Sequence, residues 1–224
     1  MNKILKIYNL LYETYGPQGW WPIIGYGYHK LEYHFPRDQN EIFEVSLGSI
    51  LTQNTTFTSV VKSLTNLNKA GTLSAKTIEA MNIEDLKEAI RPSGYFNQKT
   101  RYILEFIKFY NELNGAIPKR EDLLKVLGIG QESADSILLY GYNQLEFKVD
   151  AYTKRLLTTL GLIDEKAKYM NIKNLMQNSI KESIKDEREL LKIYQEFHAL
   201  IVAHSKKHYS KKPYGVECFL TSSL

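Results

Sequence analysis

Cysteine is nearly absent from the 224-residue sequence, which contains a single one, Cys218. A lone cysteine excludes a disulfide within the chain and any iron–sulfur cluster that needs four thiolates from the same chain. A free thiol is also typical of proteins in a reducing compartment. We therefore expect an intracellular protein without disulfides and without an iron–sulfur cluster.

Long apolar runs and biased tracts are also missing. No segment approaches the roughly 18 consecutive apolar residues of a membrane span, and the N-terminus has no apolar core like that of a signal peptide. Hydrophobic residues make up 43% of the chain and charged residues 24%, which is ordinary for a globular protein. The sequence therefore predicts a folded cytoplasmic protein that does not bind a membrane.

Acidic residues do not outnumber basic ones, and the formal net charge is +4. A positive charge suits a polyanionic partner such as a nucleic acid, but many proteins without such a partner are equally basic. Charge alone therefore favours no single function.

Apolar residues at helical spacing dominate the sequence, and no alternating run is long enough to build a sheet. The segment 41–53 is apolar on nearly every side, so we expect it at the centre of the fold. Residues 16–36, rich in glycine, tryptophan and tyrosine, are predicted to form a loop. The sequence thus predicts an all-α protein with helices at 3–15, 41–53, 58–67, 74–80, 83–90, 98–113, 120–126, 131–140, 151–160, 172–184 and 188–205.

The predicted helices at 120–126 and 131–140 are joined by Leu127-Gly128-Ile129-Gly130. Glycines in such a turn let a phosphate approach the backbone amides at the start of the second helix. A contact of this kind holds DNA without reading its sequence. The same residues are equally compatible with an ordinary helical hairpin that contains a glycine cap.

Asp150 lies 20 residues after Gly130, directly before the predicted helix 151–160. An aspartate in this position commonly caps the helix, which is a structural role on its own. Capping amides and the helix dipole also keep the carboxylate ionised. A fixed carboxylate stabilises the positive charge that develops on a sugar when an N-glycosidic bond breaks, and it can orient a water molecule.

The hairpin, its glycine turn and Asp150 together resemble the endonuclease III superfamily of helix-hairpin-helix DNA glycosylases. The resemblance implies a six-helix barrel lobe over residues 38–147, with the hairpin at about 120–141 inside it. It implies a second helical lobe formed by 1–37 and 148–224, and DNA bound in the cleft between the two lobes. It also implies that Asp150 is the catalytic residue.

Three segments resemble the DNA-binding parts of this superfamily. Gln53, in Leu51-Thr52-Gln53-Asn54-Thr55, resembles the glutamine that fills the gap left by a flipped base and offsets part of the cost of flipping. Asn97 resembles a residue of a turn close to DNA. Both side chains are also ordinary helix caps by their position. The hairpin itself contributes Gly128, Ile129, Gly130, Gln131, Glu132 and Ser133.

Two features depart from many members of the superfamily. Members that also cut the DNA strand have a lysine where this chain has Glu132, and a Schiff base with the sugar needs that amine. The resemblance therefore implies removal of the base without strand cleavage. Most members also end in four cysteines that bind an iron–sulfur cluster, whereas here only Cys218 remains and Tyr209 stands roughly where the first ligand would be.

Histidines near the C-terminus are the other potential metal ligands. His198, His204, His208 and Cys218 do not have the spacing of a zinc site. We therefore expect no metal or other cofactor, and a C-terminal tail that is held by packing.

One subgroup, 3-methyladenine DNA glycosylase III, is similar at 20–22, 51–57, 91–94 and 128–135. This similarity implies a base pocket formed by Trp20, Trp21, Pro22 and Phe57. An alkylated purine carries a positive ring, and a cation on electron-rich aromatic side chains gains up to roughly 2 kcal/mol that normal bases do not. The tryptophans are equally compatible with core packing. Leu200 replaces the subgroup's lysine on the last long helix, which leaves the identity of the damaged base open.

These features predict a monofunctional DNA glycosylase of base excision repair that flips out an alkylated purine, such as 3-methyladenine, from damaged double-stranded DNA. We expect a monomer that lies in the cytoplasm at the nucleoid. A glycosylase for mismatched thymine or uracil, or for an oxidised purine, is an alternative. A non-catalytic DNA-binding protein with the same hairpin is another.

Overall fold

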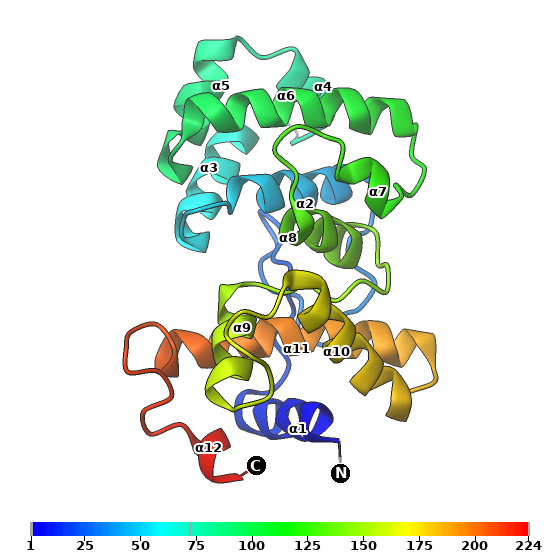
Figure 1. The fold of residues 1–224 in the computed structure, drawn as a ribbon. Helices are drawn as coiled ribbons and strands as arrows, with labels where there is room; N and C mark the ends of the chain where they lie inside the picture. Colours follow the sequence, from blue (N-terminus) through cyan, green and yellow to red (C-terminus); the bar gives the residue numbers. More distant parts are fainter. Residues whose placement is uncertain (1, 72, 224) are drawn as a thin grey trace. The chain divides into compact units, whose positions relative to one another are not determined.

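The computed structural model describes residues 2–71 and 73–223 (Figure 1). Among these residues the regular structure is helical apart from an isolated β-bridge between Ile23 and Gly27, so the predicted all-α fold is confirmed. None of the described helices has the length and apolar character to cross a membrane. The helices are α1 (Lys3–Tyr15), α2 (Gln39–Leu51), α3 (Phe57–Lys69), α4 (Ala75–Glu79), α5 (Ile83–Ile90), the 3₁₀ helix η1 (Arg91–Ser93), α6 (Phe96–Leu113), α7 (Arg120–Leu123), α8 (Gln131–Ser136), the π-helix η2 (Ile137–Gly141), α9 (Ala151–Thr159), α10 (Tyr169–Ser183), α11 (Glu187–His208) and α12 (Phe219–Ser223).

Two predicted helix boundaries are wrong in an informative way, and one helix was not predicted. The helix predicted over 120–126 ends at Leu123, because the chain then turns through hydrogen bonds from Val126 N–H to Leu123 O and from Ile129 N–H to Val126 O. The helix predicted over 131–140 becomes a π-helix after Ser136. The short helix α12 lies where no helix is predicted.

The chain divides into two compact units, and the one that contains the hairpin comprises Trp21–Tyr28 and His34–Asn143. We call it the hairpin unit. Helix α2 lies in its core, as expected, and its side chains Phe43, Leu47 and Ile50 are at most 1% exposed. The ring of Phe43 lies 6.3 Å from that of Phe106 on α6. Burial of this apolar helix by its neighbours α3 and α6 stabilises the unit that carries the hairpin.

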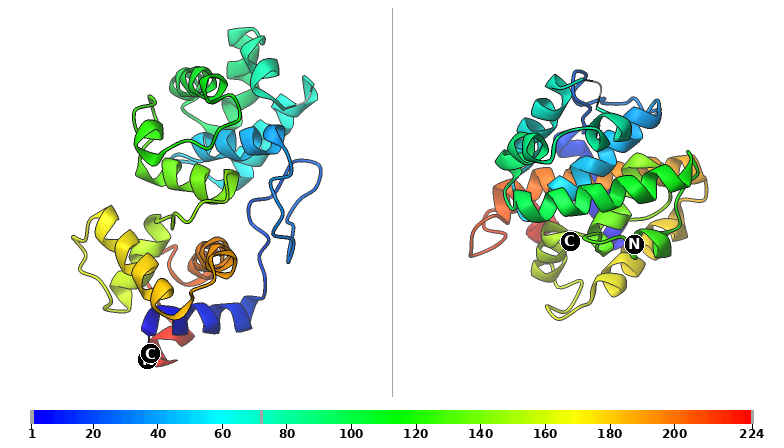
Figure 2. Two further views of the ribbon diagram at one scale, coloured as in Figure 1. Left: turned by 90° about the vertical axis from the view of Figure 1, so that its right-hand side faces the viewer. Right: turned by 90° about the horizontal axis from the view of Figure 1, so that it is seen from above.

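The other unit comprises Met1–Trp20, His29–Tyr33 and Gln144–Leu224, and we call it the Asp150 unit. Its core is formed around α11, which packs against α1 and α9. In the left view of Figure 2, α11 is seen almost end-on beside α1 and α10. The rings of Tyr194 and Phe197 on α11 are fully buried and lie 5.5 and 6.0 Å from that of Phe147. The segment before Asp150 is therefore anchored on α11.

The two units differ from the lobes predicted from the sequence at three places. Residues 21–28 and 34–37 belong to the hairpin unit although they are predicted to belong to the other lobe. For residues 21–28 the reason is Trp21, which packs so closely on Gly48 of α2 that a Cβ atom at Gly48 would lie 3.0 Å from its ring. Residues 144–147 belong to the Asp150 unit because Phe147 packs on α11.

Candidate DNA-binding and catalytic site

The hairpin is formed by α7 and α8 and is fixed by an ion pair. The Arg120 guanidinium donates to both carboxylate oxygens of Asp135, at 2.7 and 3.2 Å. Asp135 is fully buried, and Arg120 is the charged partner that such a buried carboxylate requires. This bidentate contact joins the start of α7 to α8 across the turn.

The structure explains why one position of the turn must be glycine, but not the other. Gly128 has a φ of +84°, and a Cβ atom there would lie 2.1 Å from the ring of Tyr102 on α6, so this position requires glycine. Gly130 is exposed, and a Cβ atom there would meet nothing within 4 Å. Packing therefore explains Gly128 but not Gly130, which precedes the exposed residues Gln131 and Glu132 at the start of α8.

Gln53 contacts the hairpin directly. Its side-chain amide donates to the Gly128 carbonyl oxygen at 2.8 Å and to Ser133 Oγ at 3.1 Å. The segment after α2 and the hairpin turn, which were both predicted to bind DNA, therefore lie together in the hairpin unit.

Lys99, which the sequence analysis did not single out, joins a third segment to these two. Its ammonium is buried and donates to Leu51 O and to Ser93 O, both at 2.7 Å. Burial lowers the pKa of Lys99 to about 8. Asn97 lies exposed in the first turn of α6. Lys99 thus ties the end of α2 to the loop before α6.

The predicted base pocket is divided between the units. In the hairpin unit, the Trp21 ring meets Phe57 edge to face at 5.5 Å and lies 5.8 Å from Tyr140. Pro22 is buried next to Trp21 in the chain, whereas Trp20 belongs to the Asp150 unit. The structure therefore brings Trp21 and Phe57 together beside Tyr140, and it places Trp21 and Tyr140, each 2% exposed, in the core.

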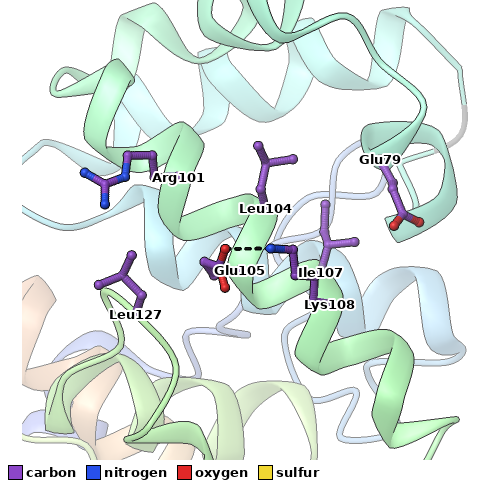
Figure 3. Close-up of a pocket in the computed structure, with 7 residues that line it drawn as sticks. All are labelled: Glu79, Arg101, Leu104, Glu105, Ile107, Lys108 and Leu127. Atoms are coloured by element: carbon purple, nitrogen blue, oxygen red, sulfur yellow. Dashed lines mark hydrogen bonds and ion pairs between the residues drawn. The ribbon is translucent and has the colours of Figure 1, made fainter.

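A cavity of about 270 Å³ in the hairpin unit contains none of these pocket residues (Figure 3). It lies along α6 and has a charged rim, on which Lys108 and Glu105 form an ion pair at 2.8 Å. Its lining residues are Glu79, Arg101, Leu104, Glu105, Ile107, Lys108 and Leu127.

Asp150 caps α9 in the Asp150 unit. Its Oδ1 accepts hydrogen bonds from Thr153 N at 2.8 Å and from Thr153 Oγ1 at 3.0 Å. Its Oδ2 lies 3.3 Å from Nε2 of His198 on α11. The Asp150 side chain is 12% exposed and that of His198 only 2%.

The carboxylate of Asp150 is held in its ionised form. Burial alone would raise its pKa, but the hydrogen bond from His198, the charge of Lys148 and the Thr153 N–H oppose burial and hold the pKa below its ordinary value. The pKa of His198 is itself lowered, by burial and by Lys148, against the opposing effect of Asp150. Since burial dominates for His198, we take the pair at neutral pH as a carboxylate and a neutral imidazole that donates Nε2–H.

Comparison with known proteins places this arrangement in a family. The family described as HhH-GPD superfamily base excision DNA repair protein matches residues 47–182. A candidate DNA repair glycosylase of Methanocaldococcus jannaschii is 37% identical, over 96% of this chain and 92% of its own length. The chain belongs to the HhH-GPD superfamily.

Other HhH-GPD proteins agree with this assignment. The endonuclease III of Sulfolobus acidocaldarius is 28% identical over 86% of this chain and 91% of its own length. The crystal structure of the H. pylori 3-methyladenine DNA glycosylase bound to 1,N6-ethenoadenine superposes with a TM-score of 0.73 at 29% identity, over 92% of this chain and 97% of that one. The predicted resemblance to the endonuclease III superfamily is thus confirmed, and the chain is a DNA glycosylase of base excision repair that binds DNA.

The C-terminal tail does not fit the iron–sulfur cluster of many HhH-GPD members, because its single cysteine supplies one thiolate where four are needed. The Cys218 thiol is buried and lies 3.2 Å from His204 Nε2 and 3.3 Å from the Tyr209 hydroxyl. His204 Nδ1 contacts the Tyr15 hydroxyl of α1 at 2.9 Å. Burial lowers the pKa of His204 to about 4, so its ring is neutral in this network.

Two residues that depart from the patterns of related proteins differ in their exposure. Leu200, which stands where the subgroup has a lysine, is fully buried on α11. Glu132 is exposed on α8. His198, Lys99 and Tyr140 were not predicted as site residues, because each has a partner that is distant in the chain and no local motif marks them.

Proposed function

We propose that this HhH-GPD protein is a monofunctional DNA glycosylase that hydrolyses the N-glycosidic bond of an alkylated purine, such as 3-methyladenine, in double-stranded DNA. The observation that carries the proposal is Asp150, an ionised carboxylate fixed by three hydrogen-bond donors at the start of α9. Within a superfamily of base excision repair proteins, such a carboxylate is the group that the chemistry needs.

Asp150 acts on the sugar in this mechanism. Breaking the bond between C1′ and the base leaves positive charge on the sugar, and a fixed anion nearby lowers the energy of that transition state. The same carboxylate accepts a proton from the water that attacks C1′. Because Thr153 and His198 hold the carboxylate, it needs little reorganisation during the reaction.

The aromatic residues support an alkylated substrate. A purine methylated on its ring carries a positive charge and has a labile glycosidic bond, so an electron-rich aromatic face can select it. Phe57 is the half-buried ring of this group, and Trp21, which is 2% exposed, supports it edge to face from the core. A mismatched or oxidised base is neutral and would instead need polar partners. The H. pylori structure, 29% identical, is described as a 3-methyladenine glycosylase, which also supports this substrate class.

Glu132 supports a monofunctional enzyme. A lyase reaction requires an amine that attacks C1′ to form a Schiff base with the opened sugar. Glu132 provides a carboxylate at the position where strand-cutting members of the superfamily have that amine, so the product is an abasic site.

Base release from a panel of substrates tests the proposal. The protein is incubated with duplex DNA that contains methylated purines, a thymine mismatch, uracil or an oxidised purine, and the released bases are separated by chromatography. We expect release of 3-methyladenine alone. Release of only thymine, uracil or the oxidised base would show that the substrate is that base and not an alkylated purine. No release from any duplex would favour a non-catalytic DNA-binding protein.

Borohydride trapping tests the absence of a lyase step. Borohydride reduces a Schiff base between protein and DNA to a stable covalent complex. With a substrate that is excised, we expect free base and an intact abasic strand but no trapped complex. A trapped complex would contradict the monofunctional assignment.

A further inference from the structure

We propose that His198 is a positioning residue, whose neutral imidazole donates Nε2–H to Asp150 Oδ2 and fixes the plane of the catalytic carboxylate. This inference rests on the proposed role of Asp150. It assigns to α11 a part in the reaction that the motif around Asp150 does not reveal.

The two oxygens of Asp150 are held by different elements. Oδ1 accepts both hydrogen bonds from Thr153, which lies on the same helix as the cap. A carboxylate held at one oxygen can still rotate about the bond that joins it to Cβ. The contact from His198 to Oδ2, at 3.3 Å, removes that freedom.

His198 approaches Asp150 from the buried side. Its side chain is 2% exposed, whereas that of Asp150 is 12% exposed. The Asp150 side chain keeps this exposure with the hydrogen bond in place, so His198 does not block the approach of the sugar and the water. Neighbouring α11 residues Tyr194, Phe197 and Ile201 are fully buried, so the core fixes the position of the imidazole.

The charge state of His198 matters as much as its position. Asp150 and Lys148 are the charged groups that act on the imidazole. Burial and Lys148 lower its pKa, so His198 donates a hydrogen bond without adding a positive charge. A cation in this place would cancel the negative charge that stabilises the sugar, whereas a neutral donor preserves it.

Two substitutions separate positioning from packing. His198→Leu fills the space with an apolar side chain of similar size that has no hydrogen-bond donor. His198→Gln places an amide nitrogen where Nε2 lies. We measure single-turnover excision of 3-methyladenine from methylated duplex DNA, the Kd for that DNA and the midpoint of thermal unfolding.

Positioning predicts a specific pattern of rates. His198→Leu slows excision by at least about tenfold, the size expected for the loss of one hydrogen bond to a charged group. Its Kd stays within about twofold of the wild type, because His198 does not touch DNA in this account. His198→Gln recovers most of the rate. A wild-type rate in His198→Leu, or a folded His198→Gln that is as slow as His198→Leu, would overturn the inference.

Nitrogen-15 NMR of the histidine side chains tests the same contact without a substrate. At neutral pH we expect His198 to be neutral and protonated on Nε2, with a chemical shift that changes in Asp150→Asn. An imidazolium, or a ring protonated only on Nδ1, would overturn the inference. If the NMR result is as expected but no methylated base is released, the proposed substrate fails and the role of His198 toward Asp150 stands.

Discussion

At the scale of single residues, Glu44 on α2 shows how burial changes the chemistry of a side chain. It is 6% exposed and accepts a hydrogen bond from Ile24 N at 2.6 Å, in the segment that carries Trp21. Burial raises its pKa from 4.5 to about 7; the Ile24 N–H opposes this shift, and Glu41 adds to it. Between these two pH values the folded protein binds a proton that the unfolded chain releases. Stability therefore falls as the pH rises through this window.

Glu44→Gln removes that dependence. The amide is neutral at every pH, and its Oε1 can still accept from Ile24. We expect little change in the free energy of unfolding at about pH 4.5 and a gain on the order of 2 kcal/mol at about pH 8. Urea denaturation at the two pH values measures both. An equal effect at the two pH values would show that the carboxyl does not titrate with the raised pKa.

Asp150 could be singled out from the sequence as the candidate catalytic residue, but its surroundings could not be predicted. Asp150 is marked by its place before a helix and after a glycine hairpin, both of which are local patterns. His198 lies 48 residues away from Asp150 and comes next to it only when α11 packs on α9. From the sequence, His198 could be considered only as a potential zinc ligand, because a histidine that binds metal and one that is buried in the core differ only in their partners, which the sequence does not show.

At the scale of elements, two polar side chains of the hairpin unit hold together the three segments that are predicted to bind DNA. Gln53 joins the segment after α2 to the hairpin, and Lys99 joins the end of α2 to the loop before α6. The position of each segment therefore depends on side-chain contacts as well as on helix packing.

Lys99→Met removes the hydrogen bonds that Lys99 donates to two of these segments. The carbonyls of Leu51 and Ser93 lose their shared donor, and a buried carbonyl without a partner costs about 1–3 kcal/mol. We expect the free energy of unfolding, measured by urea denaturation, to fall by about 1–3 kcal/mol. The Kd for DNA, measured by fluorescence anisotropy, should rise about tenfold. Lys108→Met is the matched control, because Lys108 is exposed and pairs with Glu105 on its own helix. An equal effect of both substitutions would contradict this account.

The two hairpin glycines give a second prediction. Gly128→Ala puts a Cβ atom 2.1 Å from the Tyr102 ring at a φ of +84°, so we expect a loss of stability of roughly 2 kcal/mol or more. Gly130→Ala meets open space, so it should leave stability nearly unchanged but weaken DNA binding by placing a side chain between backbone and phosphate. Thermal unfolding and DNA titrations of both variants check this. Unchanged DNA affinity in Gly130→Ala would contradict a phosphate contact at this turn.

Helix positions could be predicted well where apolar residues recur at helical spacing, as over α1 and α5. The errors lie where tertiary contacts decide the local structure. The turn after α7 depends on Tyr102 packing on Gly128, and the π-helix after α8 brings Gly141 against α2. Periodicity within a segment carries no information about either contact.

At the scale of the whole molecule, a net charge of +4 and a hairpin predicted to bind the DNA backbone lead us to expect that DNA affinity is mainly electrostatic. Raising the salt concentration from about 50 mM to about 200 mM should weaken binding of undamaged duplex about tenfold or more. Single-turnover excision with all DNA bound should change little. Anisotropy titrations across this range measure the effect, and an affinity independent of salt would contradict it.

Asp150→Asn tests the central claim most directly. The amide retains an oxygen that can cap α9 but loses the negative charge, so fold and DNA affinity should persist. The measurement is single-turnover release of 3-methyladenine from methylated duplex DNA by wild type and variant, with the Kd and thermal midpoint of each as controls. We expect the variant to be slower by at least about a hundredfold with an unchanged Kd. Excision at the wild-type rate by folded, DNA-bound Asp150→Asn would contradict the assignment of Asp150 as the catalytic carboxylate.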